Sequence, residues 1–545
     1  MKPRILTACL WLIAGLLAFL AWRRWLHHTV PEQALADRAP PAAEAAASAA
    51  PAATGLSADA GNPSASFRTR LRERLVQADA RPREAVLTFA DAEAYARFLQ
   101  RAQQLGLTVL AQLDALRAVR VRYEALAALE ADLREHANDY ADATANYFIR
   151  VPQPPAKAAR AAIDAVPFRN SALAFLGVPA DHATWGRGAT IAVLDTGVAP
   201  DITLDGRIRY LNIGLGTLPG AGGEDGHGTA VAALAAGISA DAPGVAPAAS
   251  ILSIRVTAAD GSSDIFTLAQ AIVAAVDART PVINISLGGY QTTPALNAAI
   301  DYAVDRGSLI VAAAGNDQAA QLAWPAADAR VVSVAAIDAA GRQVAFSNSG
   351  PQLQISAPGY GVQTAWLEGQ RVYVNGTSAS APLVSGAIAA VLAQTPGLTA
   401  AQAWDIVSRT TSDAGAPGVD ADYGRGLLNV DWAVNAANPA HVDPAVATHY
   451  YDTARHEMDF VVQNRSATAV SGLTLDVDSN GVTVSHRLPD LAAGASWIVA
   501  VPVEAATLAA ANGLTFTTRL VTPFGVTDVN PANNLLSSHL AAPAP

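Results

Sequence analysis

The sequence is poor in cysteine and in charged side chains. Cys9 is the one cysteine among 545 residues, so no disulfide can form within the chain and the fold must rest on buried apolar side chains. Charged residues make up 15% of the chain, and 47 acidic residues against 36 basic ones give a net charge of −11. This balance argues against nucleic-acid binding, which requires a basic face. With 51% hydrophobic residues, the chain can form several cores, and its length predicts about three or four domains.

The longest uncharged apolar run lies at the start of the chain. Ile5–Trp22 is flanked by basic residues on both sides. A run of this length can just cross a bilayer as a helix, whereas a cleavable signal peptide has a shorter apolar core with a small-residue cleavage site close behind it. We therefore predict that residues 1–28 are a membrane anchor that holds the rest of the chain outside the cytoplasm. The alternative is a cleaved signal peptide and a secreted or periplasmic protein.

Composition and periodicity divide the segment that follows. Residues 29–66 are rich in Ala and Pro and predict a flexible linker. Residues 67–152 show patterns in the order β-α-β-β-α-β, which is typical of a ferredoxin-like α+β domain. Its expected strands are Ala85–Phe89, Thr108–Leu113, Ala118–Tyr123 and Tyr147–Val151, and its first helix should end at Gly106. Residues 153–180 form a Pro/Ala-rich junction.

The two remaining segments differ in their secondary-structure pattern. Between residues 181 and 440, apolar strands alternate with small-residue helices, which predicts an α/β domain with a mostly parallel sheet and helices on both faces. Residues 441–545 instead carry short strands from about His449 onward, separated by turn residues, and predict a β-sandwich. The last part, Asp528–Asn534, resembles the ends of bacterial immunoglobulin-like adhesion domains.

Three polar residues of the α/β segment follow apolar strands or precede small-residue helices. Asp195 ends the strand Ile191–Leu194, Asn316 follows the strand at Leu309–Val311, and His227 stands between two glycines before a helix. Ligands of open α/β sheets bind outside the carboxyl ends of the strands, so we expect these side chains at one edge of the sheet. Each residue also has a plainer interpretation, since Asp and Asn commonly cap turns and glycines commonly form them.

The segment Asn375–Pro382 is a Gly-led turn that feeds a helix of small apolar residues, Ala379–Gln394. Ser378 at this helix start would have its own N–H pointing outward, aided by the positive end of the helix dipole. That placement suits a nucleophile whose attack creates an oxyanion, although a serine there could simply cap the helix.

A serine nucleophile requires a base at neutral pH, and imidazole has the unperturbed pKa closest to working pH. Two histidines lie between Ser171 and Ala440. His182 sits in a polar segment and is expected at the solvated surface, so His227 is the candidate base. The carboxylate of Asp195 would hold the tautomer of the imidazole and stabilise the imidazolium.

These motifs, in the order Asp195, His227, Asn316 and Ser378, resemble those of the subtilisin-like serine proteases, or subtilases, from about Gly186 to Asn429. The resemblance implies an endopeptidase that hydrolyses protein substrates through an acyl-enzyme. It also implies that the Asn316 amide and the Ser378 N–H hold the oxyanion. The chain departs from the family at Ala379, where Met is most common.

The resemblance extends to substrate and propeptide. Residues matching the family's substrate-binding segments are Ser286, Leu287, Gly288, Gly289, Ala314 and Gly315. The domain at 67–152 occupies the place of the subtilase propeptide, which implies a self-processing zymogen with its own propeptide as a partner; the alternative is an N-terminal spacer domain. We expect no cofactor. No Asp-rich loop has convincing calcium-ligand spacing, so structural calcium stays open and no metal ligand is assigned. Two alternatives remain: a non-proteolytic adhesion or carrier protein on this scaffold, and a protease that cleaves only itself.

Overall fold

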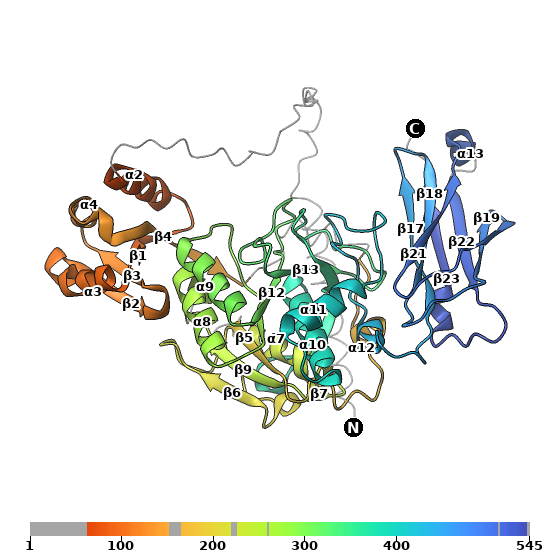
Figure 1. Ribbon diagram of the computed structural model, residues 1–545, viewed down its shortest axis with the longest axis horizontal. Helices are drawn as coiled ribbons and strands as arrows, with labels where there is room; N and C mark the ends of the chain where they lie inside the picture. Colours follow the sequence, from red (N-terminus) through yellow and green to blue (C-terminus); the bar gives the residue numbers. More distant parts are fainter. Residues whose placement is uncertain (1–62, 152–164, 220–225, 259–260, 511–512, 542–545) are drawn as a thin grey trace, which may run out of the picture. The chain divides into compact units, whose positions relative to one another are not determined.

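The computed structural model describes most of the chain beyond the N-terminal segment (Figure 1). The described residues are 63–151, 165–219, 226–258, 261–510 and 513–541. The predicted membrane anchor lies outside them, as does most of the predicted linker. Among the described residues, α10 (Thr377–Gln394) is the helix long and apolar enough to cross a membrane, but 83% of it is buried, as in the core helix of a folded domain.

A seven-stranded sheet forms the centre of the α/β unit, with the strand order β14-β13-β12-β11-β5-β9-β6. Every neighbouring pair is parallel, which confirms the predicted mostly parallel sheet. In chain order the strands are β5 (Thr190–Asp195), β6 (Ile208–Leu211), β9 (Ser250–Arg255), β11 (Val282–Ile285), β12 (Leu309–Ala313), β13 (Val332–Ile337) and β14 (Ile355–Pro358).

Helices cover both faces of this sheet, as predicted. Along β5, Ile191 and Val193 belong to the core that contains α7 and α10, whereas the alternate residues Ala192 and Leu194 belong to the core that contains α8 and α9. The strand therefore contributes apolar side chains to both faces, as a buried parallel strand must. The helices are α7 (His227–Ala236), α8 (Ile265–Asp277), α9 (Pro294–Asp305), α10, α11 (Ala400–Arg409) and α12 (Val430–Asn435).

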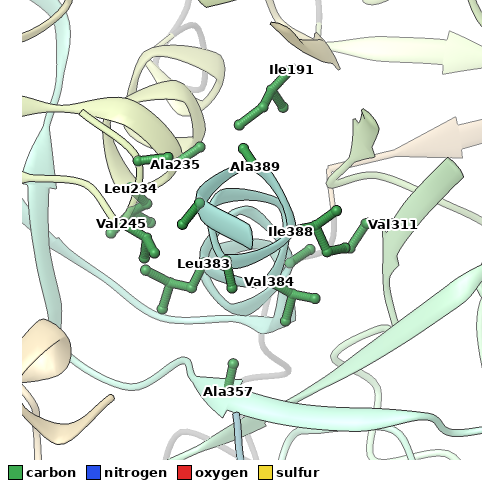
Figure 2. Packing of buried hydrophobic residues seen from close by; sticks show 14 of the residues in the cluster. Ile191, Leu234, Ala235, Val245, Val311, Ala357, Leu383, Val384, Ile388 and Ala389 are labelled. Atoms are coloured by element: carbon green, nitrogen blue, oxygen red, sulfur yellow. The ribbon is translucent and has the colours of Figure 1, made fainter. Parts of the chain in front are cut away.

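The long helix α10 is surrounded by other elements. Figure 2 looks along it and shows Ile388 near Val311 of β12, with Leu234 and Ala235 of α7 on another side. Small residues allow this packing: a Cβ on Gly386 would lie 2.8 Å from the Val245 Cβ and 2.9 Å from the Ala235 carbonyl oxygen. The small apolar residues therefore allow α10 to lie buried in a tightly packed core from Thr377 to Val391.

An antiparallel sheet forms in the segment predicted as ferredoxin-like. Its strand order is β4-β1-β3-β2, with β10 of the α/β unit added beside β4. The strands are β1 (Ala80–Phe89), β2 (Leu107–Leu113), β3 (Ala118–Tyr123), β4 (Tyr140–Arg150) and β10 (Ser262–Asp264), and the helices are α2 (Pro63–Leu75), α3 (Ala92–Arg101) and α4 (Leu126–Glu135). A 3₁₀ turn, Ala102–Leu105, continues α3 to Gly106, whose φ of 68° ends the helix as expected.

Two strand starts and one additional helix in this segment differ from the prediction. Strands β1 and β4 begin at Ala80 and Tyr140, before the expected Ala85 and Tyr147, because both strands start in segments rich in residues that strands disfavour, such as Ala, Asp, Asn and Pro. Helix α2 was not expected, and its start at Pro63 falls inside the predicted linker. Its sequence is dominated by polar residues, so apolar periodicity gives little signal for it.

Two antiparallel sheets around one hydrophobic core form the C-terminal region, with strand orders β17-β18-β21 and β20-β19-β22-β23. The sequence gives little strand signal at β17 and β23, because most of their residues are half-exposed or exposed and their apolar side chains do not alternate with polar ones. The elements are β17 (Pro444–Asp452), β18 (Glu457–Asn464), β19 (Thr474–Ser479), β20 (Val482–Arg487), β21 (Ser496–Pro502), α13 (Ala505–Ala510), β22 (Leu514–Val521) and β23 (Leu535–Leu540).

Shorter elements of the α/β unit are α6 (Ala172–Phe175), β7 (Ile238–Ser239), β8 (Ala242–Pro243), β15 (Val362–Ala365) and β16 (Arg371–Val374).

Candidate active site

Asp195 and His227 meet at the carboxyl end of the central strand. Asp195 is the last residue of β5, and its Oδ1 lies 2.8 Å from His227 Nδ1. The same oxygen accepts the Thr196 N–H at 2.7 Å, and the Asp195 side chain has no solvent exposure. A buried carboxylate at Nδ1 favours the tautomer with its proton on that atom, which leaves Nε2 available to accept a proton.

The glycines around His227 permit this approach. A Cβ on Gly228 would lie 2.3 Å from the Gly197 carbonyl oxygen, and one on Gly226 would lie 2.2 Å from the ring of Trp366. The Gly228 N–H also donates to the Thr196 hydroxyl at 2.9 Å. The start of α7 is therefore pressed against the turn after β5, which sets His227 beside Asp195.

Ser378 is the second residue of α10, after the turn at Gly376 (φ 138°). A Cβ on Gly376 would lie 3.0 Å from the Ser378 hydroxyl oxygen and 2.8 Å from Asn316 Nδ2. The hydroxyl and the amide nitrogen therefore border the same small space, and a side chain at residue 376 would fill it.

Pro382 lies inside α10. As the sixth residue of the helix, it lacks the N–H that would donate to the Ser378 carbonyl. The Ser286 hydroxyl donates to that carbonyl instead, at 3.1 Å. Ser286 thus satisfies the backbone of the predicted nucleophile.

Asn316 is held by Thr377. Both the backbone N–H and the hydroxyl of Thr377 donate to Asn316 Oδ1, each at 2.9 Å, and the Gly315 N–H donates to the Thr377 hydroxyl at 3.1 Å. Because its oxygen is engaged in this way, the Asn316 amide directs its NH₂ group away from Thr377. Sequence reasoning gave Thr377 no role, since only the fold brings it to Asn316.

A second amide fixes the loop that carries Asn316. Asn348 Oδ1 accepts the N–H groups of Asp317 and Ala319 at 2.9 and 3.0 Å, and its Nδ2 donates to the Tyr290 hydroxyl at 2.8 Å. Tyr290 in turn donates to Asp317 at 2.5 Å. Burial, and then this bond to Asp317, raise the pKa of Tyr290, so the phenol stays protonated and remains a donor.

The segments predicted to bind substrate lie beside this site. Gly288 exchanges two backbone hydrogen bonds with Arg150 of β4, at 3.0 and 3.1 Å, and Gly289 pairs with Trp324. The Leu287 side chain is buried in the core, and Ala314 bonds through its N–H to Val334. At Gly315 (φ 109°) a Cβ would lie 2.3 Å from Asn348 Nδ2, so only glycine fits there.

His182 is placed elsewhere and is half-buried rather than fully solvated. Its ring nitrogens lie 2.8 Å from the Pro179 carbonyl oxygen and 3.1 Å from that of Gly244. The carbonyl groups of Pro179 and Gly244 therefore hold the His182 ring, although the polar sequence around His182 predicts that it faces water.

The site combines a hydroxyl at a helix start, an imidazole oriented by a buried carboxylate, and an amide NH₂ beside the hydroxyl. Such a set can remove a proton from the hydroxyl, form an acyl intermediate and hold the resulting oxyanion.

Comparisons with known proteins agree with this chemistry. The profile of the subtilase family (Peptidase S8) matches residues 186–426. Subtilisin BL from Lederbergia lenta is 34% identical over 261 residues, which are 47% of this chain and 94% of that protein. A thermostable alkaline protease from Halalkalibacterium halodurans is 34% identical over 253 residues, which are 46% of this chain and 68% of that protein.

A solved structure shares the fold over a longer stretch. Fervidolysin from Fervidobacterium pennivorans, a keratinolytic enzyme related to subtilisin, covers 86% of this chain and 77% of its own at a TM-score of 0.57 and 18% identity. At that identity the likeness speaks for the fold. Taken with the family profile and the relatives above, it leads to one assignment: the chain belongs to the subtilase family and is a subtilisin-like serine endopeptidase.

Proposed function

We propose that Ser378 is the nucleophile, His227 the general base and Asp195 the group that orients His227. The Asn316 amide and the Ser378 N–H stabilise the oxyanion. The observation that carries these roles is the 2.8 Å contact between His227 Nδ1 and buried Asp195, together with the common space that the Ser378 hydroxyl and Asn316 Nδ2 border at Gly376. Protein substrates then bind as extended strands against Gly288 and β10, because exposed sheet edges pair with a peptide backbone largely irrespective of its side chains.

The same proposal makes residues 67–152 an inhibitory propeptide. Strand β4 lies in the position of such a substrate: it pairs with β10 from Phe148 to Arg150, and Arg150 pairs with Gly288. While β4 stays there, no other peptide can use this edge. The chain is therefore made as a self-processing zymogen.

Self-processing should leave a new N-terminus between residues 152 and 165. Residues up to Arg150 are hydrogen-bonded to the substrate-binding edge, whereas from Val166 onward the backbone bonds to Asp338, Ala339, Tyr360 and Gly361 of the α/β unit. Cleavage between Arg150 and Val166 leaves both sets of hydrogen bonds intact. We expect N-terminal sequencing of the purified active form to give a start in this interval, and the Ser378→Ala chain to remain full length under the same conditions. A start beyond residue 170, or cleavage of the Ser378→Ala chain at the same rate, would refute the proposal.

The ion pair between Arg120 of β3 and Asp264 of β10 should determine how firmly the propeptide is held. Arg120 Nη1 lies 2.9 Å from Asp264 Oδ2, with side chains 17% and 4% exposed. Removing one charged partner from such a hydrogen-bonded pair costs about 1.5–3 kcal/mol. We expect Asp264→Asn, which keeps the N-cap of α8, to shorten the lag between self-cleavage and peptide hydrolysis about 10-fold or more.

The matched control is Arg83→Ala. Arg83 also belongs to the propeptide, but its partner Glu124 and its own side chain are 82% and 67% exposed, and exposed pairs contribute little. The lag should stay the same in this variant. Equal lags in Asp264→Asn, Arg83→Ala and the unmodified chain would show that the Arg120–Asp264 pair does not hold the propeptide.

We extend the proposal to the segments at the two ends of the chain. We propose that residues 1–28 anchor the protein in a membrane, with secretion after signal cleavage as the alternative. The C-terminal sheets form an immunoglobulin-like module, which their two antiparallel sheets around one core support, and this module serves substrate binding, envelope binding or stability alone.

A further inference from the structure

A cluster of metal-binding side chains lies where the α/β unit joins the C-terminal sheets, away from the residues proposed for catalysis. Asp431 belongs to α12, and His441 and Asp443 belong to the connection that leads into β17. One ligand atom from each of the three residues lies within 4.8 Å of the other two. His441 and Asp443 are 6% and 2% exposed.

His441 indicates that the cluster has a missing partner. Its Nε2 is buried and has no hydrogen-bond partner among the described residues. Asp431 Oδ2 is 3.5 Å from this nitrogen, which is long for a hydrogen bond. Two ligands of one tetrahedral zinc ion, each about 2.0–2.2 Å from the metal, lie about 3.3–3.6 Å apart. The observed separation fits two ligands of a common ion.

A second buried atom at the cluster also lacks a partner. Asn533 donates through Nδ2 to Asp443 Oδ1 at 2.8 Å, while its own Oδ1 has no hydrogen-bond partner in the described part of the chain. Buried polar atoms are rarely left without a partner, because their desolvation is then uncompensated. The connection between β22 and β23 thus brings an amide oxygen close to the same place.

The charges at the cluster leave room for a divalent cation. Asp528 and Arg465 are the charged groups beyond the three ligands that act on Asp443. The cluster itself holds two carboxylates, those of Asp431 and Asp443, and Asp443 is 2% exposed. A divalent cation would compensate these carboxylates where little water reaches them.

We propose that Asp431, His441 and Asp443 bind one divalent transition-metal ion of the zinc class. An imidazole with two carboxylates suits zinc and its neighbours, whereas calcium and magnesium prefer oxygen ligands throughout. The ion links the last helix of the α/β unit to the first strand of the C-terminal sheets and fixes the connection between them. This role is independent of the proteolytic chemistry.

The test uses the full chain as the tag-free Ser378→Ala variant, which cannot digest itself, after dialysis against a chelator. Titration with zinc chloride in a calorimeter should give one bound ion per chain, and zinc should raise the unfolding temperature. His441→Ala and Asp443→Asn should each weaken zinc binding at least 10-fold. His486→Ala, which removes a histidine from β20 outside the cluster, should bind zinc as the parent does.

A second readout avoids dependence on buried substitutions that prevent folding. Cobalt(II) added to the parent chain should give the visible absorption of a low-symmetry site with nitrogen and oxygen ligands, and zinc should displace it. No saturable zinc binding, no cobalt absorption, or equal affinity in the parent, His441→Ala and Asp443→Asn would overturn the proposal.

Discussion

Replacement of Ser378 by alanine should abolish peptide hydrolysis. The expected loss in kcat is about 10⁶-fold, which is the magnitude known for removal of the nucleophile or the base in subtilisin, a member of the same family. The physical reason is that the Ser378 hydroxyl, which lies with Asn316 Nδ2 at the Gly376 turn, is the atom proposed to attack the peptide bond. The residual rate then comes from substrate binding and the oxyanion donors alone.

The measurement must separate loss of chemistry from loss of processing, because in the proposed zymogen an unprocessed chain would stay blocked by β4. We therefore suggest a recognition site for an added protease within residues 153–164, so that every variant can be matured in the same way. Hydrolysis of unfolded casein and of a chromogenic peptide is then compared.

Ser380→Ala is the matched control for this experiment. Ser380 lies in the same helix, and its hydroxyl donates to the carbonyls of Ala357 and Pro358 at 3.0 and 3.2 Å. Its removal should lower the free energy of unfolding by about 1 kcal/mol and leave kcat within a few-fold. If the matured Ser378→Ala chain hydrolysed casein as fast as Ser380→Ala does, the assignment of the nucleophile would be wrong.

Asn316→Ala should lower kcat by about 10²–10³-fold, or about 2.7–4 kcal/mol of barrier, with KM nearly unchanged. This magnitude is the one known for the corresponding amide of subtilisin. The effect falls on kcat because the Asn316 NH₂ group donates to the carbonyl oxygen of the scissile bond only when negative charge has developed on that oxygen. The bonds from Thr377 to Asn316 Oδ1 keep the amide in this orientation before substrate arrives.

Steady-state kinetics on the matured enzyme would measure this effect. Asn375→Ala provides the control, since Asn375 lies next to the same turn but uses its Oδ1 to accept the Gly361 N–H at 2.7 Å. Its loss should affect stability more than turnover. A rise in KM at constant kcat for Asn316→Ala would mean that Asn316 binds the ground state and is not an oxyanion donor.

The sequence predicted the polar residues of the site because each stands at a recognisable structural boundary. Asp195 ends an apolar strand, and Ser378 opens a helix of small residues, beginning at Thr377 rather than at the expected Ala379. The parallel sheet follows from the alternation of buried strands and helices. These signals are local, so a single sequence carries them.

The features that escaped prediction depend on contacts between distant segments. Nothing near Thr377 or Asn348 indicates that both bond to the loop around Asn316. Likewise, the bond from Ser286 to the Ser378 carbonyl replaces an interaction that Pro382 removes 4 residues further along α10. The Asp431, His441 and Asp443 cluster has no motif spacing, since its geometry arises only where α12 meets the C-terminal sheets.

Covalent labelling with diisopropyl fluorophosphate tests most directly whether these separate segments converge on one activated hydroxyl. The reagent phosphorylates a serine that an adjacent base activates, and peptide mapping by mass spectrometry locates the adduct. We predict stoichiometric modification of the matured chain at Ser378, little modification in the His227→Ala variant, and none at Ser380. Modification at another serine, or equal labelling of Ser378 with and without His227, would contradict the account.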